Sequence, residues 1–232
     1  LAVFEGNKGF MDAIAGRFEI DWSQEDLERV TRTILKRYNA EIHSQSALEA
    51  IAELKAAHGI HAEDIDRIEV EIFDVAYRII GGGEEGDKTI VHTKEEADHS
   101  LPYLLAVMLL DGEVMPEQYL PERILRDDVQ RLLRRVVVRP QAEFSRRFPA
   151  EMPCRVTLWL KDGRQLVREK ADYEGFHTRP MPWEAIVAKF ERLSAPYTDP
   201  ALRDELIAAV QNLEDLQAPD LTALLARVRA PG

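Results

Sequence analysis

The chain has 232 residues and a formal net charge of −12 at pH 7, because 42 Asp and Glu residues outnumber 30 Lys and Arg residues. This charge disfavours nucleic acid as a partner, since excess carboxylates repel phosphates. A hydrophobic content of 45% is typical of a soluble globular protein with a core. The single Cys excludes an internal disulfide and a Cys-rich zinc site or iron–sulfur cluster built by this chain alone.

The sequence also argues against a membrane protein. The longest apolar run, residues 101–110, is about half of the ~20 residues that a transmembrane helix needs. The first residues, LAVFEGNKGF, have neither the basic nor the apolar region of a signal peptide. Together with the sparse cysteine, this predicts a cytoplasmic protein. The missing initial Met indicates a processed chain or a piece of a longer one.

Two helices are predicted in the first quarter of the chain. The first begins at Ser23, which can cap it, and has apolar residues at helical spacing as far as Ile34. The second begins with a capping box formed by Ser46 and Glu49, and it ends at Gly59.

The middle of the chain predicts strands mixed with helices. Residues 68–72 alternate apolar and acidic side chains, which is typical of a half-exposed strand. The apolar run at 101–110 predicts a buried core helix. Residues 154–160 alternate again, and Asp162-Gly163 predicts the two-residue turn of an antiparallel hairpin whose return strand is 165–171.

The C-terminal tail is helical again, with three amphipathic stretches separated by prolines. The expected fold class is therefore α+β. It consists of a helical segment at 1–35, a small α+β domain with the hairpin at 36–174, and a helical segment at 175–232. Apolar faces on the helical flanks are usually covered in an assembly, which predicts a homodimer.

The densest polar cluster runs from Lys36 to Gln45, between a helix end and a helix start. It offers two cations, Lys36 and Arg37, with the carboxylate of Glu41 and the imidazole of His43. A base beside a carboxylate-binding cation suits proton abstraction next to a carboxylate. Ordinary capping and surface charge would explain the same residues, because short polar loops are common.

A second cluster precedes the apolar helix. Ser100 is suited to cap this helix, and His99 and Tyr103 flank the cap. A phenol at the mouth of a buried helix can donate to a substrate or act as an acid. The alternative is a capping motif followed by a core tyrosine. The six His residues have no metal-ligand spacing, so no metal and no cofactor is expected.

Four segments together resemble the MmgE/PrpD family. They are KRYNAEIHSQSALEA at 36–50, ADHSLPYLLAVMLLDG at 97–112, DGR at 162–164 and GFHTRPMPWEAIVAKF at 175–190. The resemblance implies dehydration of 2-methylcitrate, in propionate metabolism, as the typical activity. Cis-aconitate decarboxylase and iminodisuccinate epimerase are relatives. Family members are about twice as long, which implies that the helical flanks belong to an all-helical domain whose N-terminal half is missing here.

The resemblance also implies site residues between the two domains. The family's active-site Lys falls on Lys36, its variable acid-or-His position on Glu41, and the Tyr after its His-Ser pair on Tyr103. The Glu at position 41 resembles the dehydratase branch, because the decarboxylase has His there. One departure is Asn39, where many members have Pro.

Three functions are compatible with these observations. The first is the C-terminal portion of a 2-methylcitrate dehydratase-like hydro-lyase that removes water from a tricarboxylate. In it, Lys36, Glu41, His43 and Tyr103 are catalytic, and Arg37, His99 and Ser100 bind substrate. The second is an epimerase or decarboxylase of a related polycarboxylate. The third is a non-catalytic binding or dimerisation domain that lacks its active-site partner.

Overall fold

The computed structural model describes residues 2–19, 33–83 and 86–229, together with the single residues 21, 23, 26, 28 and 30. The chain divides into two compact units, residues 1–33 and 34–232, which are described separately. The first unit contains α1 (Ala2–Glu5) and a single π-helical turn, Met11–Ala15. The helix expected to begin at Ser23 lies outside the described residues.

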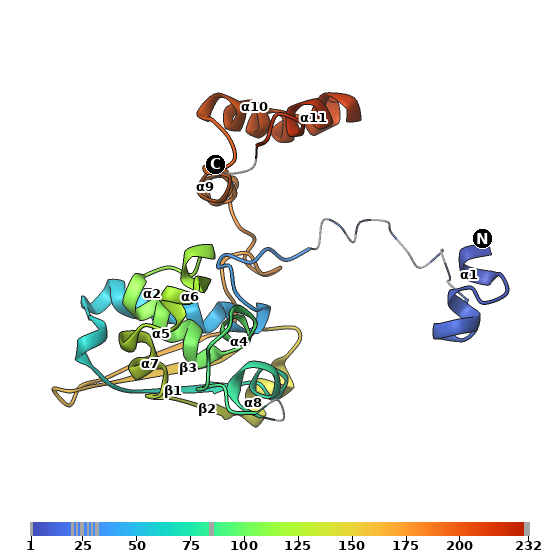
Figure 1. Ribbon diagram of the computed structural model, residues 1–232. Helices are drawn as coiled ribbons and strands as arrows, with labels where there is room; N and C mark the ends of the chain where they lie inside the picture. Colours follow the sequence, from blue (N-terminus) through green and yellow to red (C-terminus); the bar gives the residue numbers. More distant parts are fainter. Residues whose placement is uncertain are drawn as a thin grey trace. The chain divides into compact units, whose positions relative to one another are not determined.

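The second unit is built on a four-stranded mixed sheet in the order β2-β1-β3-β4 (Figure 1). Its strands are β1 (Ile65–Ile72), β2 (Val136–Pro140), β3 (Cys154–Leu160) and β4 (Gln165–Lys170). β1 pairs in parallel with β2 and antiparallel with β3, which pairs antiparallel with β4. Parallel and antiparallel pairs in one sheet, covered by helices, confirm the expected α+β class.

The predicted hairpin is confirmed, with register from Cys154 opposite Lys170 to Trp159 opposite Gln165. The predicted two-residue turn is wrong, because the loop has three residues, 161–163. The N–H of Gly163 donates to the carbonyl of Leu160 at 3.0 Å, and Gly163 has a φ of +88°. A glycine that takes the left-handed conformation at the third loop position is the usual arrangement of such loops.

Helices cover the sheet on one side (Figure 1). α2 (Gln45–His58) contacts β3 and β4, and α5 (Leu101–Asp111) contacts α2, β2 and α7 (Asp127–Leu133). Residues 101–109 are all buried, which confirms the expected core helix. The apolar positions of β1 face this helical layer and are buried, whereas its acidic positions are less so.

Short helical elements connect these main elements. They are Ile42–Ser44, Ala62–Asp64, α3 (Asp74–Ala76), Tyr77–Gly81, α4 (Lys94–Asp98), Pro116–Tyr119, α6 (Pro121–Ile124) and α8 (Ala142–Arg147).

The three amphipathic stretches of the tail form helices as expected. They are α9 (Trp183–Ser194), α10 (Pro200–Gln211) and α11 (Ala218–Leu225), with a 3-10 turn at Leu213–Asp215 before α11. None of the helices in the described part of the chain is both long and apolar enough to cross a membrane.

Candidate functional site

The loop before α2 is held by the buried side chain of Gln45. Its Oε1 accepts from the N–H of Tyr38 at 3.0 Å, and its Nε2 donates to the carbonyls of Tyr38 at 3.2 Å and Ala40 at 3.4 Å. A buried amide that makes these bonds satisfies backbone groups that the loop itself leaves unpaired. The backbone of the first polar cluster is therefore held in one conformation by hydrogen bonds to Gln45.

Asn39 fixes the same loop to a distant segment. Its N–H donates to the carbonyl of Val114 at 3.0 Å, and its carbonyl accepts from the hydroxyl of Tyr119 at 2.5 Å. A proline at this position would have no N–H to donate. The departure at Asn39 from the pattern of many family members thus brings an additional hydrogen bond.

Glu41 and His43 form a carboxylate–imidazole pair on this loop. Glu41 Oε1 lies 2.6 Å from His43 Nδ1, and Glu41 Oε2 accepts from the N–H of His43 at 2.8 Å. The second bond caps the 3-10 helix Ile42–Ser44. The side chains are only 10% and 14% exposed, respectively, so the pair is largely shielded from water but still reachable.

Two aromatic rings hold the imidazole of His43 in place. Its ring centre is 5.4 Å from that of Phe73 and 5.8 Å from that of Phe148, both edge-on, and the two phenyl rings stack at 4.4 Å. Among the described residues, no hydrogen-bond partner lies at His43 Nε2. With Nδ1 on the carboxylate, Nε2 is the nitrogen that can meet a ligand.

Lys36 and Arg37 lie on the other side of Asn39 along the chain. Lys36 is exposed, and its carbonyl accepts from the ammonium of Lys189 in α9. Arg37 Nη1 lies 2.6 Å from Glu174 Oε1, so this guanidinium is already in an ion pair. Of these two cations, Arg37 therefore has a carboxylate partner, and Lys36 has none among the described residues.

The second cluster begins with a helix cap, as expected. Ser100 Oγ accepts from the N–H of Tyr103 at 3.1 Å and donates to the carbonyl of Lys88 at 2.5 Å, so this hydroxyl is buried and occupied. His99 is exposed, with Nδ1 3.6 Å from Asp98 Oδ2.

Tyr103 lies in the core, with no exposed surface. Its hydroxyl donates to the carbonyl of Gln118. Burial raises the pKa of this phenol, because the phenolate would lose its hydration.

Tyr119 joins the two clusters, and sequence reasoning missed it. Its hydroxyl is 2.5 Å from the Asn39 carbonyl and 3.4 Å from Asp98 Oδ1, and its ring centre is 6.3 Å from that of Tyr103. Burial, followed by the charge of Asp98, raises the pKa of Tyr119. Tyr119 thus contacts both Tyr103 and the first polar cluster. No sequence pattern singles out a tyrosine that follows a short polar turn.

Glu49 is a second residue that sequence reasoning misread. It does not cap α2, which begins at Gln45. Its side chain is 7% exposed and accepts from Lys170 Nζ at 2.8 Å, from Arg179, and from the N–H of Glu174 at 3.1 Å. Burial acts to raise the pKa of Glu49, but the hydrogen bonds from Arg179 and Lys170 outweigh it, so the pKa is lowered. The predicted capping box is therefore wrong, because burial on the helix face that meets β4 gives Glu49 different partners.

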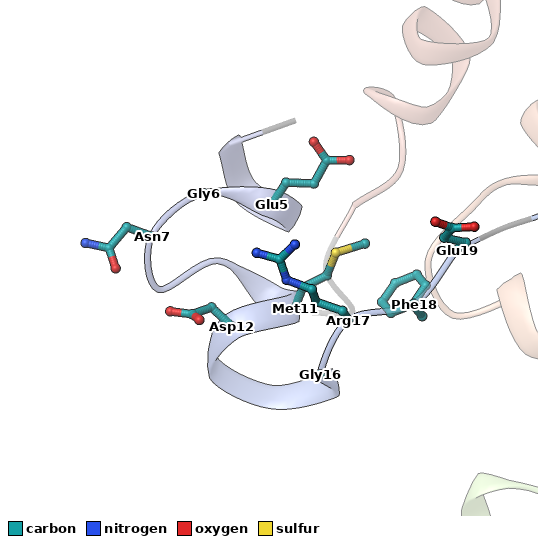
Figure 2. Close-up of a pocket in the computed structure, with 9 residues that line it drawn as sticks. All are labelled: Glu5, Gly6, Asn7, Met11, Asp12, Gly16, Arg17, Phe18 and Glu19. Atoms are coloured by element: carbon teal, nitrogen blue, oxygen red, sulfur yellow. The ribbon is translucent and has the colours of Figure 1, made fainter.

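Neither a metal cluster nor the pocket of the first unit coincides with these residues. In the described residues no group of three or more His, Cys, Asp or Glu side chains is placed to hold a metal ion. Figure 2 shows a pocket of the first unit, lined by residues between Glu5 and Glu19. This pocket contains none of the predicted site residues.

Comparison with known proteins gives a family match and distant relatives. The model of the MmgE/PrpD C-terminal domain matches residues 38–215. The chain is 25% identical to cis-aconitate decarboxylase of Mus musculus over 244 residues, which cover 98% of this chain and 48% of that protein. The human cis-aconitate decarboxylase is also 25% identical, over 98% of this chain and 48% of its own length.

A mitochondrial 2-methylcitrate dehydratase of Yarrowia lipolytica is 24% identical, over 93% of this chain and 43% of that protein. The chain therefore spans about half the length of the curated relatives that it matches.

Proposed function

Because this chain belongs to the MmgE/PrpD family, we propose that it forms part of a 2-methylcitrate dehydratase-like hydro-lyase, which removes water from a tricarboxylate. The observation that carries the proposal is the pair formed by Glu41 and His43, 2.6 Å apart beside two stacked phenyl rings. Dehydration next to a carboxylate requires a base for the carbon-bound proton. His43, oriented by Glu41, supplies that base through Nε2, as a carboxylate-bound imidazole does in hydrolytic triads.

The remaining roles follow from charge and position. The ammonium of Lys36 binds the substrate carboxylate next to the carbon that loses its proton, and this charge stabilises the carbanion-like state. The leaving hydroxyl needs a proton, for which Tyr103 is the predicted donor. Because this phenol is buried and donates to the carbonyl of Gln118, it would have to exchange that bond for one to the substrate. Arg37, His99 and Ser100 stay predicted substrate ligands, although Arg37 already pairs with Glu174 and the Ser100 hydroxyl is buried and bonded within the chain.

Decarboxylation is the second candidate, because the two decarboxylases match slightly more of this chain than the dehydratase does. Loss of CO₂ from an unsaturated tricarboxylate breaks a carbon–carbon bond and then requires only protonation of carbon, so a base is not needed for the first step. Glu41 favours dehydration, because its contact with Nδ1 orients the imidazole and leaves Nε2 to take the proton. An epimerase would need an additional acid on the opposite face of the substrate.

The wider setting is proposed as well. We expect a cytoplasmic protein of propionate metabolism, which acts without a cofactor through its own side chains. A homodimer is proposed because the apolar side of α9 contains no fully buried residue. A non-catalytic domain remains the alternative if the chain shows no turnover.

The test is turnover of 2-methylcitrate and of cis-aconitate, by this chain and by a longer protein that contains it, with alkene formation and CO₂ release followed separately. We expect His43→Asn to lower kcat/KM for dehydration by roughly 10²- to 10⁴-fold, the range for a lost general base. His58→Asn, at an exposed position near the end of α2, is the matched control and should leave turnover unchanged.

Lys36→Ala and Tyr103→Phe should each lower kcat/KM by roughly tenfold to ten-thousandfold. CO₂ release from cis-aconitate without dehydration would replace the proposal by the decarboxylase. Equal turnover in the His43 and His58 variants would refute the role of the pair.

A further inference from the structure

Helix α9 brings a second lysine to Lys36. The ammonium of Lys189 donates to the backbone carbonyl of Lys36, although the two residues lie 153 positions apart in the sequence. Lys189 is half-buried, and burial together with the charge of Lys36 lowers its pKa. The ammonium of Lys189 thus contacts the backbone of Lys36, and the two positive charges repel each other.

Neighbouring cations have carboxylate partners, whereas these two lysines have none among the residues that the structure describes. Arg37 pairs with Glu174 at 2.6 Å, and Arg192, three residues after Lys189 on α9, pairs with Glu117 at 2.9 Å. In the described part of the chain, no carboxylate lies within ion-pairing distance of Lys36 or Lys189. This is notable in a chain of net charge −12.

The surface around Lys189 is also concave. Lys189 lines a pocket of about 330 Å³ together with Arg37 and Arg192, and Met181 and Ala185 form part of its apolar wall. This volume is at the lower end of the range of small-molecule sites, ~300–1,000 Å³. The acids at the pocket, Glu113 and Glu174, are the ones within reach of the two arginines.

We propose that Lys189 is a second substrate-binding residue, which shares one carboxylate of a polycarboxylate with Lys36. A carboxylate has two oxygens and can accept from both ammonium groups, and it would neutralise the repulsion between them. The inference rests on the proposed function for the identity of the ligand. It goes further, because it assigns a residue of the C-terminal helical segment to the site on the loop before α2.

The first test measures binding of citrate, a stable tricarboxylate probe, by isothermal titration calorimetry at constant ionic strength. Lys189→Met keeps the aliphatic stem and removes the charge, and we expect the Kd for citrate to rise about ten- to a hundredfold, the loss of one hydrogen bond to a charged group. Lys189→Arg should bind citrate more tightly than Lys189→Met. The matched control is Lys161→Met in the loop between β3 and β4, an exposed lysine outside the lining of this pocket, which should leave the Kd within about twofold.

The second test follows the titration of Lys189 by NMR of its side chain, in the wild type and in Lys36→Met. Both citrate and removal of the Lys36 charge should raise the pKa of Lys189, because each removes uncompensated repulsion. Circular dichroism and thermal unfolding of each variant show that it is folded, so a changed Kd reports the site.

The outcomes separate this inference from the proposed function. If 2-methylcitrate is dehydrated but Lys189→Met changes neither KM nor the Kd for citrate, the inference is wrong and the function stands. If citrate binds through Lys189 but neither substrate is turned over, the anion site stands and the hydro-lyase proposal fails. Wild-type protein that does not bind citrate at millimolar concentration overturns the inference.

Discussion

Replacement of Glu49 by Gln tests how the buried charge network holds α2 to the tail of the α+β unit. The amide keeps the size of the side chain and an acceptor for the N–H of Glu174, and it removes the charge paired with Lys170 and Arg179. Removing one partner of a buried ion pair is destabilising by about 3–5 kcal/mol. Lys170 keeps Glu53 at 2.5 Å, so we expect the lower end, about 3 kcal/mol.

The loss should depend on pH in a defined direction. Because the pKa of Glu49 is lowered in the folded state, its ionised form stabilises the fold. That contribution is fully present above the ordinary pKa of a glutamate, 4.5, and is lost as the pH falls through the lowered pKa of the folded state. The difference between wild type and Glu49→Gln should therefore be largest near neutral pH and should shrink in acid.

Urea unfolding near pH 7 and again near pH 3 measures both effects. Glu214→Gln, at an exposed position that makes no ion pair with a described residue, is the matched control and should change the free energy of unfolding by no more than about 0.5 kcal/mol. If Glu49→Gln behaves like this control at neutral pH, the network does not stabilise the fold. If the two pH values give the same loss, the cause is packing rather than charge.

Three further substitutions test the stability of the loop before α2 and of two glycine positions. Tyr119→Phe removes the hydroxyl that donates to the Asn39 carbonyl and should lower the free energy of unfolding by about 1–2 kcal/mol; an unchanged urea midpoint would contradict this. Gly163→Ala should lower it by about 1 kcal/mol, because φ is +88° with open space around the new Cβ. Gly175→Ala should be clearly worse in the same assay, because its Cβ would also collide with the Leu35 carbonyl; equal losses for the two glycines would refute the collision.

The fold could be predicted where the spacing of apolar residues along the chain shows which side chains are buried. The alternation at 68–72 and 154–160 and the apolar run at 101–110 each correspond to an element in the structure. The turn at Asp162-Gly163 shows the limit of such patterns. The same two residues fit two loop lengths, and only the pairing register determines which position the glycine takes.

The site was predictable where its partners are close in sequence. Glu41 and His43 are two residues apart, so their pairing follows from one short loop. The contacts of this loop with Tyr119 and Lys189 join residues 80 and 153 positions apart, and no local pattern contains that information. Glu49 was misread for the same reason, because its partners Lys170 and Arg179 lie more than 100 positions away in the sequence.

The loop from Leu35 to Gln45 is held by several distant parts of the same unit. Its backbone bonds to the carbonyl of Gly175, to the Val114–Tyr119 segment and to Lys189 of α9, while Gln45 holds it from within. A loop fixed in this way presents its side chains without a large loss of entropy on binding, which is what preorganised sites require. Because of the same contacts, the position of the proposed substrate-binding side chains depends on how distant residues pack against the loop. A residue such as Gly175, which never meets the ligand, can therefore move Lys36, because the Leu35 N–H donates to the Gly175 carbonyl at 2.8 Å, one residue before the cation.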